Sequence, residues 1–75
     1  MASANELRLQ SAEEDLSSAR KTYEKEEKWA QSAYESEDPS EDFDMWIAQG
    51  NAPGFQAANH RLQIAKAVVE RIKRE

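Results

Sequence analysis

The sequence contains no cysteine and only one histidine, His60, among its 75 residues. Without cysteine the chain cannot form a disulfide framework, and one histidine is too few for a Cys/His zinc site. Domains this small are usually stabilised by disulfides, by a structural metal or by oligomerisation. Oligomerisation is the remaining route, so we expect the chain to associate with a second copy of itself.

Long apolar runs are also missing. The longest, residues 45–48, is far shorter than the roughly 20 residues of a membrane span, and the first residues lack the basic-then-apolar pattern of a secretory signal. These absences favour a cytoplasmic protein with no membrane partner. The formal net charge of -5 would oppose contact with nucleic acid phosphates and anionic lipids, so we expect no direct nucleic acid binding and favour a protein partner.

Two seams of small or apolar residues are the main positive feature of the sequence. Between Leu9 and Ala33 such residues recur at alternating steps of three and four, and Glu26 is the only exception. A second seam with the same spacing comprises Phe55, Ala58, Leu62, Ala65, Val69 and Ile72. This spacing is typical of helices that lie against each other. We therefore predict an all-α, coiled-coil-like antiparallel helical hairpin that forms a single domain over residues 1–75.

The predicted helices span about residues 4–36, 39–49 and 54–74. Ser3 or Asn5 can cap the first helix, which contains neither glycine nor proline. Opposite charges support antiparallel pairing of the two long helices, because the segment 1–19 is mainly acidic and the segment 55–75 mainly basic.

The short second helix has its own start and stop signals. We predict Asp38 as its N-cap, Pro39 as its first residue and Glu41 as the capping-box partner. Gly50 lies where a left-handed residue would end it. Phe43, Trp46 and Ile47 then share one face, which we expect to pack against the aromatic end of the first helix.

The last helix carries more apolar surface than one neighbour can cover. Ala57, Ile64 and Val68 form a second apolar row beside the seam. We expect this row to meet a second chain, so that a dimer forms a four-helix-type bundle. The predicted dimer interface comprises Leu9, Leu16, Ile64, Val68 and Ile72.

Glu26 occupies a seam position, where an unpaired buried carboxylate would be unfavourable. Arg61 lies inside the apolar arc of the last helix, and a register that sets Leu16 near Val69 brings Arg61 level with Glu26. The two side chains either extend to solvent along their methylene groups or pair across the seam and fix its register. We take the second as our hypothesis.

Two groups of residues are candidates for binding another protein. The aromatic candidates are Trp29, Tyr34 and Trp46, because Trp and Tyr dominate interface hot spots. The acidic candidates belong to a run that begins at Glu35 and continues with Glu37, Asp38, Glu41, Asp42 and Asp44. Three interpretations of these acids are open. They form a solvated turn that also caps the second helix, they form a docking patch for a basic protein surface, or they mimic the DNA backbone. A calcium site fits poorly, because the alternating ligands and central glycine of an EF-hand are missing.

Catalytic motifs are not recognisable. The sequence shows no nucleophile motif, no glycine-rich phosphate loop and no recognisable paired-carboxylate pocket, and His60 has no carboxylate at a helical neighbour position. We expect no enzyme activity, no cofactor, no metal and no small-molecule substrate.

The expected function is that of a small acidic protein-binding module, an adaptor or inhibitor that binds an unidentified protein. The alternatives are a DNA mimic that blocks a DNA-binding protein and a structural or assembly subunit of a larger helical complex. In size and helical build, rather than in any motif, the chain resembles small phage-encoded proteins that sequester host regulators or enzymes.

Overall fold

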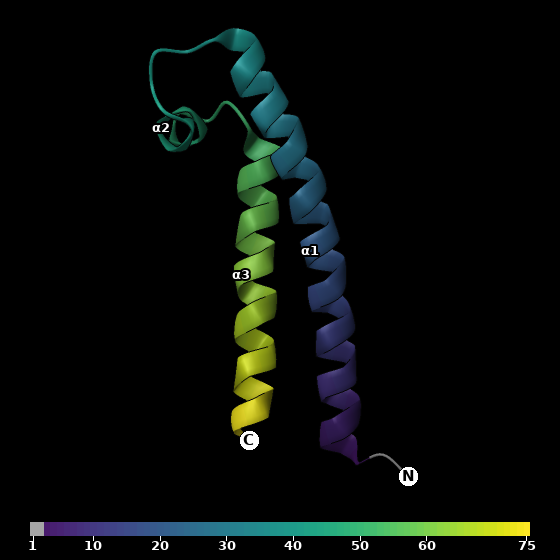
Figure 1. The fold of residues 1–75 in the computed structure, drawn as a ribbon. Helices are drawn as coiled ribbons and strands as arrows, with labels where there is room; N and C mark the ends of the chain where they lie inside the picture. The colour runs from purple at the N-terminus through teal and green to yellow at the C-terminus, as the bar shows by residue number, and fades with distance from the viewer. Residues whose placement is uncertain (1–2) are drawn as a thin grey trace.

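In a computed structural model that describes residues 3–75, the chain forms three helices: α1 (Ala4–Glu37), α2 (Phe43–Ala48) and α3 (Pro53–Arg74). The described residues include no strand, which confirms the all-α prediction. The long helices α1 and α3 run side by side in opposite directions, and the short α2 lies at the end where they are connected (Figure 1). The principal extents of 55 × 18 × 13 Å describe a thin rod without a third layer.

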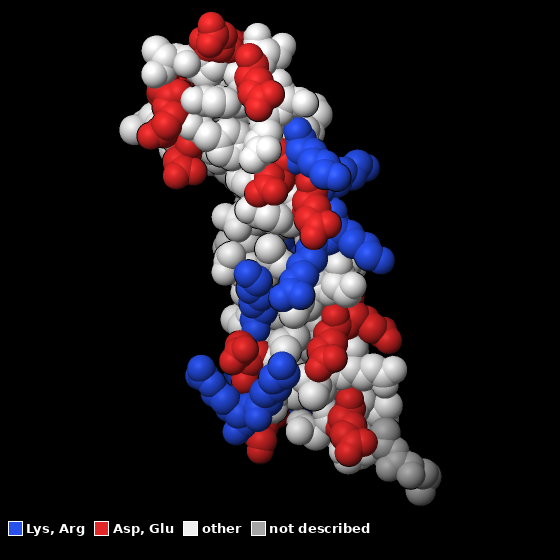
Figure 2. Space-filling model, viewed as in Figure 1, with Lys and Arg blue, Asp and Glu red and all other residues white. Residues whose placement is uncertain are grey.

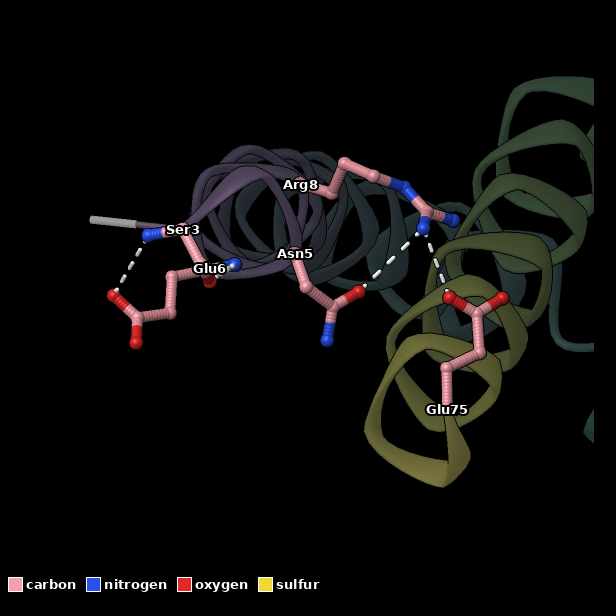
Figure 3. Close-up of polar contacts among 5 residues, drawn as sticks. All are labelled: Ser3, Asn5, Glu6, Arg8 and Glu75. Carbon is pink, nitrogen blue, oxygen red and sulfur yellow. Dashed lines mark hydrogen bonds and ion pairs between the residues drawn. The ribbon is translucent and has the colours of Figure 1, made fainter.

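Helix α1 begins with a complete capping box, as Figure 3 shows. The Ser3 hydroxyl accepts a hydrogen bond from the Glu6 amide at 3.1 Å, and the Glu6 carboxylate accepts one from the Ser3 amide at 3.4 Å. Two of the free amides at the helix start are thereby satisfied. Ser3 is therefore the N-cap, one of the two residues that the sequence proposed.

The predicted start of the second helix is wrong by one turn. Asp38 adopts the left-handed conformation (φ 47°) and ends α1, with its amide donating to the Glu35 carbonyl oxygen at 3.3 Å. An N-cap needs an extended backbone, so Asp38 cannot also start α2. Asp42 has that backbone (φ -74°, ψ 170°), and its side chain accepts from the Met45 amide at 2.8 Å. Pro39 and Glu41 consequently lie in the connection.

The end of α2 agrees with the sequence. Gly50, directly after the C-cap residue Gln49, has a φ of 88°, a conformation that glycine adopts without strain. Helix α3 then starts with Pro53 at its first position, where the missing amide of proline has no helical partner to lose.

The buried residues of the two long helices lie on the two predicted seams. On α3 they are Phe55, Ala58, Leu62, Ala65, Val69 and Ile72, the six residues of the second seam. On α1 the buried residues are Ala19 and Ala30, both fully covered. One core cluster joins Ala19 to Leu62 and Ala65, and a second cluster at the connected end gathers Ala30, Trp46, Ala52 and Phe55. The small residues of α1 thus lie against larger side chains of the opposite elements.

Charges on the surface follow the predicted segregation in part. Figure 2 shows acidic residues around the connection and α2, and basic residues gathered over the C-terminal part of α3. In the Arg61–Asp15 pair, at 3.5 Å, the base lies on α3 and the acid on α1, as the sequence predicts. In the Arg8–Glu75 pair, at 2.8 Å, the base lies on α1 and the acid at the end of α3 (Figure 3).

Candidate functional site

Several large apolar side chains remain exposed. They are Leu7 (56% exposed), Trp29 (55%), Met45 (54%), Ile64 (52%) and Val68 (43%). Single exposed apolar residues are ordinary on protein surfaces, but a contiguous apolar surface marks a binding site. The positions of these residues relative to one another therefore decide whether they form a site.

Two hollows place most of them on the same side of the rod. Near the connected end, Trp29 lines a hollow with Lys25, Glu26, Pro53 and Gly54. Near the open end, Leu7 and Val68 line a groove whose other residues are Arg8, Ser11, Ala12, Asp15 and Ile72.

The heptad spacing shows that the two hollows share one side. On α1, Lys25 follows Ser11 of the groove by two heptads, and Trp29 follows Asp15 by the same interval. On α3, Val68 follows Gly54 by two heptads as well. Ile64 lies one helical turn before Val68 and one heptad after Ala57, so all three belong to the same face of α3. We call this surface, made of Leu7, Trp29, Ala57, Ile64 and Val68, the apolar side.

Among residues 3–75, the opposite side of the rod lacks large exposed apolar residues. Its groove is lined by Glu13, Leu16, Ser17, Arg20, Val69 and Lys73, and none of the large exposed apolar residues contributes to it. Both sides carry charged residues, and the two sides differ in where the large exposed apolar side chains lie.

The structure divides the five predicted dimer-interface residues. Ile64 and Val68 are exposed, as a role in binding a second chain requires. Leu9 and Leu16 are half-buried between the long helices, and Leu16 packs on the Ala19 cluster. Ile72 is only 6% exposed, because α1 covers it within the same chain. In the predicted interface, Ile72 can therefore contribute only the small exposed part of its side chain, which lines the groove beside Leu7.

Of the three aromatic candidates, Trp29 is the most exposed and Trp46 is buried. Trp46 is 3% exposed, and its ring lies 5.6 Å from that of Tyr34 and 6.2 Å from that of Phe43. Tyr34 is half-buried, and its hydroxyl donates to the Glu41 carbonyl oxygen at 2.6 Å. Trp46 and Tyr34 therefore hold α2 onto the hairpin.

The acidic candidates are partly explained by local structure. Asp42 caps α2 and Asp38 ends α1, so both have a structural role in the connection between the two helices. Glu37 and Asp44 are exposed, and Glu41 is half-buried and supplies the carbonyl oxygen that Tyr34 contacts. Residues 3–75 contain no group of three or more His, Asp or Glu side chains that could hold a metal ion, and His60 is exposed.

The hypothesised Glu26–Arg61 pair is not formed among the described residues. The Arg61 guanidinium instead contacts Asp15 at 3.5 Å and the Ser18 hydroxyl at 3.3 Å. Ser18 precedes Glu26 by about 12 Å along the helix axis. The register is therefore set so that Arg61 reaches a more N-terminal part of α1 than the hypothesis required.

Glu26 lies instead at the start of α3. A Cβ atom on Gly54 would come within 2.8 Å of the Glu26 carboxylate oxygen, so the carboxylate rests directly on this glycine. Gly54 is the second residue of α3, where backbone amides are free and the helix dipole favours a negative charge. The N-cap residue Ala52 makes no side-chain hydrogen bond to these free amides. The exception on the α1 seam is thus explained by the neighbouring helix terminus.

Replacing Glu26 by Gln should lower the free energy of unfolding by about 0.5–1 kcal/mol, because the shape is kept and the charge near the α3 terminus is lost. Urea denaturation followed by circular dichroism measures the change. The matched control is Glu24→Gln on the exposed part of α1, for which we expect no comparable loss. Equal effects of the two variants would contradict the assignment.

Tyr23 connects the two core clusters, and its ring centroid lies 5.3 Å from that of Phe55. Burial raises the pKa of its phenol, and the nearby Glu27 carboxylate raises this pKa further. Both effects oppose ionisation of a phenol that is already neutral at physiological pH.

Sequence reasoning did not identify the side shared by Trp29, Pro53, Ile64 and Val68. Each helix gave its own exposed apolar positions, but the side on which they meet depends on how the two helices are rotated against each other. The two-heptad spacing from Asp15 to Trp29 is the signal that could have placed Trp29 on the same side of α1 as the groove residue Asp15.

The described helices include none that is both long enough and apolar enough to cross a membrane. Comparison of the chain with protein-family models, with curated proteins and with solved structures finds no match. The functional conclusion therefore depends on the residues of the apolar side and on their arrangement.

Proposed function

We propose that this protein is a small acidic protein-binding module, an adaptor or inhibitor, and that the apolar side is its docking surface. The observation that supports this most is the sidedness of the rod. Leu7, Trp29, Ile64 and Val68 are each 43–56% exposed on one side, whereas none of the large exposed apolar residues lines the groove on the opposite side. We place this activity in the cytoplasm as part of the same proposal.

The chemistry of the apolar side suits a helical polypeptide partner. Leu7 and Trp29 are separated by about 33 Å along the axis of α1, at the usual rise of an α-helix. Ala57 and the small residue Ser11 lie between bulkier neighbours, so a partner helix can approach closely and fit its own side chains beside Trp29 and Ile64. Trp29 is the expected hot spot, because a large aromatic ring beside Pro53 offers the most contact area.

The test is a pull-down from a lysate of the source organism with the tagged protein and its variants. Trp29→Ala should weaken binding of the retained protein by about 30-fold or more, as the loss of a hot spot does. Ile64→Glu should abolish retention by placing a carboxylate on the apolar side. Gln63→Glu adds the same charge on a neighbouring exposed position and should leave retention unchanged.

The DNA-mimic alternative gives a different pattern in the same experiment. Neutralising Glu37 and Asp44, two exposed acids that do not cap a helix, would then release the partner, and half-molar salt would do the same. Retention that survives both treatments but is lost with Trp29→Ala supports the apolar side. Retention that survives Trp29→Ala and Ile64→Glu contradicts it.

A further inference from the structure

The apolar side is a long strip rather than a pocket, and on α1 its large apolar residues, Leu7 and Trp29, lie at its two ends with Ser11, Asp15 and Lys25 between them. It extends over about 33 Å of α1, within a molecule whose greatest extent is 55 Å. A compact domain would cover only part of this strip, whereas another helical rod can follow its whole length. The chain itself is such a rod.

We propose that the apolar side binds a second copy of this chain, packed antiparallel, with the two-fold axis passing close to Ser18. The inference depends on the proposed function in one respect, that the apolar side is a docking surface. It adds a second occupant of this surface, another copy of the chain that competes with the protein partner, and it gives the orientation and register of that copy.

The register follows from the positions of Leu7 and Trp29, the large exposed apolar side chains of α1. Ser18 is the midpoint of the chain segment between Leu7 and Trp29. Ser18 faces the apolar side, since it follows Ser11 of the groove by one heptad and contacts Arg61. In a symmetric interface every contact occurs twice. An axis at Ser18 therefore sets Trp29 of each copy against Leu7 of the other.

Charge selects the antiparallel orientation over the parallel one. The segment 35–44 contains six acids and no base. A parallel dimer would bring both of these acidic turns together at one end. An antiparallel dimer separates them by almost the length of the rod, far beyond the screening length of about 8 Å at physiological salt. It also brings each acidic turn to the end of α3 in the other copy, where Arg71, Lys73 and Arg74 gather (Figure 2).

The available area is sufficient for a stable dimer. Specific interfaces bury about 800 Å² on each partner, which is about one-seventh of the 5602 Å² exposed by this chain. One side of a two-helix rod can supply that share. The opposite side, with Glu13, Arg20 and Lys73, then remains in contact with water in the dimer.

Analytical ultracentrifugation at micromolar concentration tests the partner. We expect a dimer for the wild-type chain and a monomer for Ile64→Glu, with the dissociation constant raised about 100-fold or more, because two carboxylates enter one apolar interface. Gln63→Glu is the matched control and should remain dimeric. Circular dichroism establishes that both variants are folded. A monomeric wild-type chain, or a folded Ile64→Glu dimer of unchanged affinity, would overturn the proposal.

Single cysteines test the orientation, since the chain has no cysteine of its own. Ser18→Cys should form a disulfide-linked dimer on oxidation, because the axis brings residue 18 of both copies together. Leu7→Cys should not cross-link to itself, but a mixture of Leu7→Cys and Trp29→Cys chains should give a cross-linked pair. Rapid cross-linking of Leu7→Cys alone would indicate a parallel dimer and refute the inference.

The two proposals fail in different ways. If the chain is monomeric but Trp29→Ala still releases a protein in the pull-down, the second copy is excluded and the binding function stands. If the chain forms the antiparallel dimer but no retained protein depends on Trp29 or Ile64, the inference stands and the adaptor or inhibitor function is contradicted.

Discussion

Replacement of Trp46 by Ala is expected to lower the free energy of unfolding by about 3–5 kcal/mol, the usual loss for a buried Trp. Trp46 is 3% exposed and packs on the rings of Tyr34 and Phe43. A core this small rarely supplies more than about 3–5 kcal/mol in total. We therefore expect the variant to be largely unfolded at 25 °C, or to lose α2 and its connections.

The dependence of α2 on this residue is the reason for so large an effect. With six residues, α2 is far too short to be stable as an isolated helix. Its attachment comes from Trp46, Phe43 and Ile47, which pack into the cluster around Ala30 and Phe55. Without the indole ring, α2 keeps only the half-buried Phe43 and Ile47, the Asp42 cap and hydrogen bonds such as that from Gln56 to the Ile47 carbonyl oxygen.

Urea denaturation measured by far-UV and near-UV circular dichroism tests this expectation. Trp29→Ala is the matched control, because the same residue type is removed from a 55% exposed position. At concentrations below those of self-association, its free energy of unfolding should stay within about 0.5 kcal/mol of the wild-type value. Similar losses for the two variants would show that Trp46 has no special place in the core.

Replacement of Leu62 by Ala is expected to cost about 2–5 kcal/mol, the second largest effect. Leu62 is 6% exposed at the centre of α3 and joins the cluster of Ala19 and Ala65. Removing its side chain leaves a cavity beside Ala19 and Ala65, in a cluster against which Leu16 and Tyr23 also pack. The substitution should therefore weaken the contact between α1 and α3 at this level of the rod.

Thermal and urea unfolding at several protein concentrations measure this loss. The destabilisation by Leu62→Ala should persist at the lowest concentration, because the contact lies within one chain. The control is Gln63→Ala, an exposed neighbour on α3 that should have little effect. If Leu62→Ala were harmless at low concentration, the packing of α3 on α1 would have to be held by other residues.

The seams show how much of the fold the sequence contains. Periodicity reports which face of each helix is buried, and all six residues from Phe55 to Ile72 on the second seam are buried in the structure. The Ser3 cap and the left-handed Gly50 were equally readable, because their side chains, or the lack of one, determine the local backbone.

Choices between chemically equivalent residues could not be read in the same way. Asp38 and Asp42 can both start a helix, and only the left-handed conformation that ends α1 at Asp38 decides between them. Trp29 and Trp46 are both large and aromatic, and their burial depends on where α2 turns back. Tertiary geometry settled both choices.

The apolar residues of the candidate site could be predicted from the sequence, but the side of the rod that they share could not. Ile64 and Val68 stood out as a second apolar row on one helix, and Trp29 as a flanking ring on the other. Their common side depends on the register and rotation of α1 against α3. The Glu26–Arg61 hypothesis failed for the same reason, since Glu26 lies on Gly54 and Arg61 lies near Ser18.

The Arg8–Glu75 contact has a mechanical consequence, because it places the first turns of α1 and the last turn of α3 at the same end of the rod. A pulling force applied between these two turns would load the α1–α3 contacts one after another, as in a zipper, rather than all at once in shear. The aromatic cluster of Tyr23, Tyr34, Phe43, Trp46 and Phe55 at the far end would be reached last. Tethering the protein through this end would therefore open it gradually and at low force, with the connection around α2 as the last folded part.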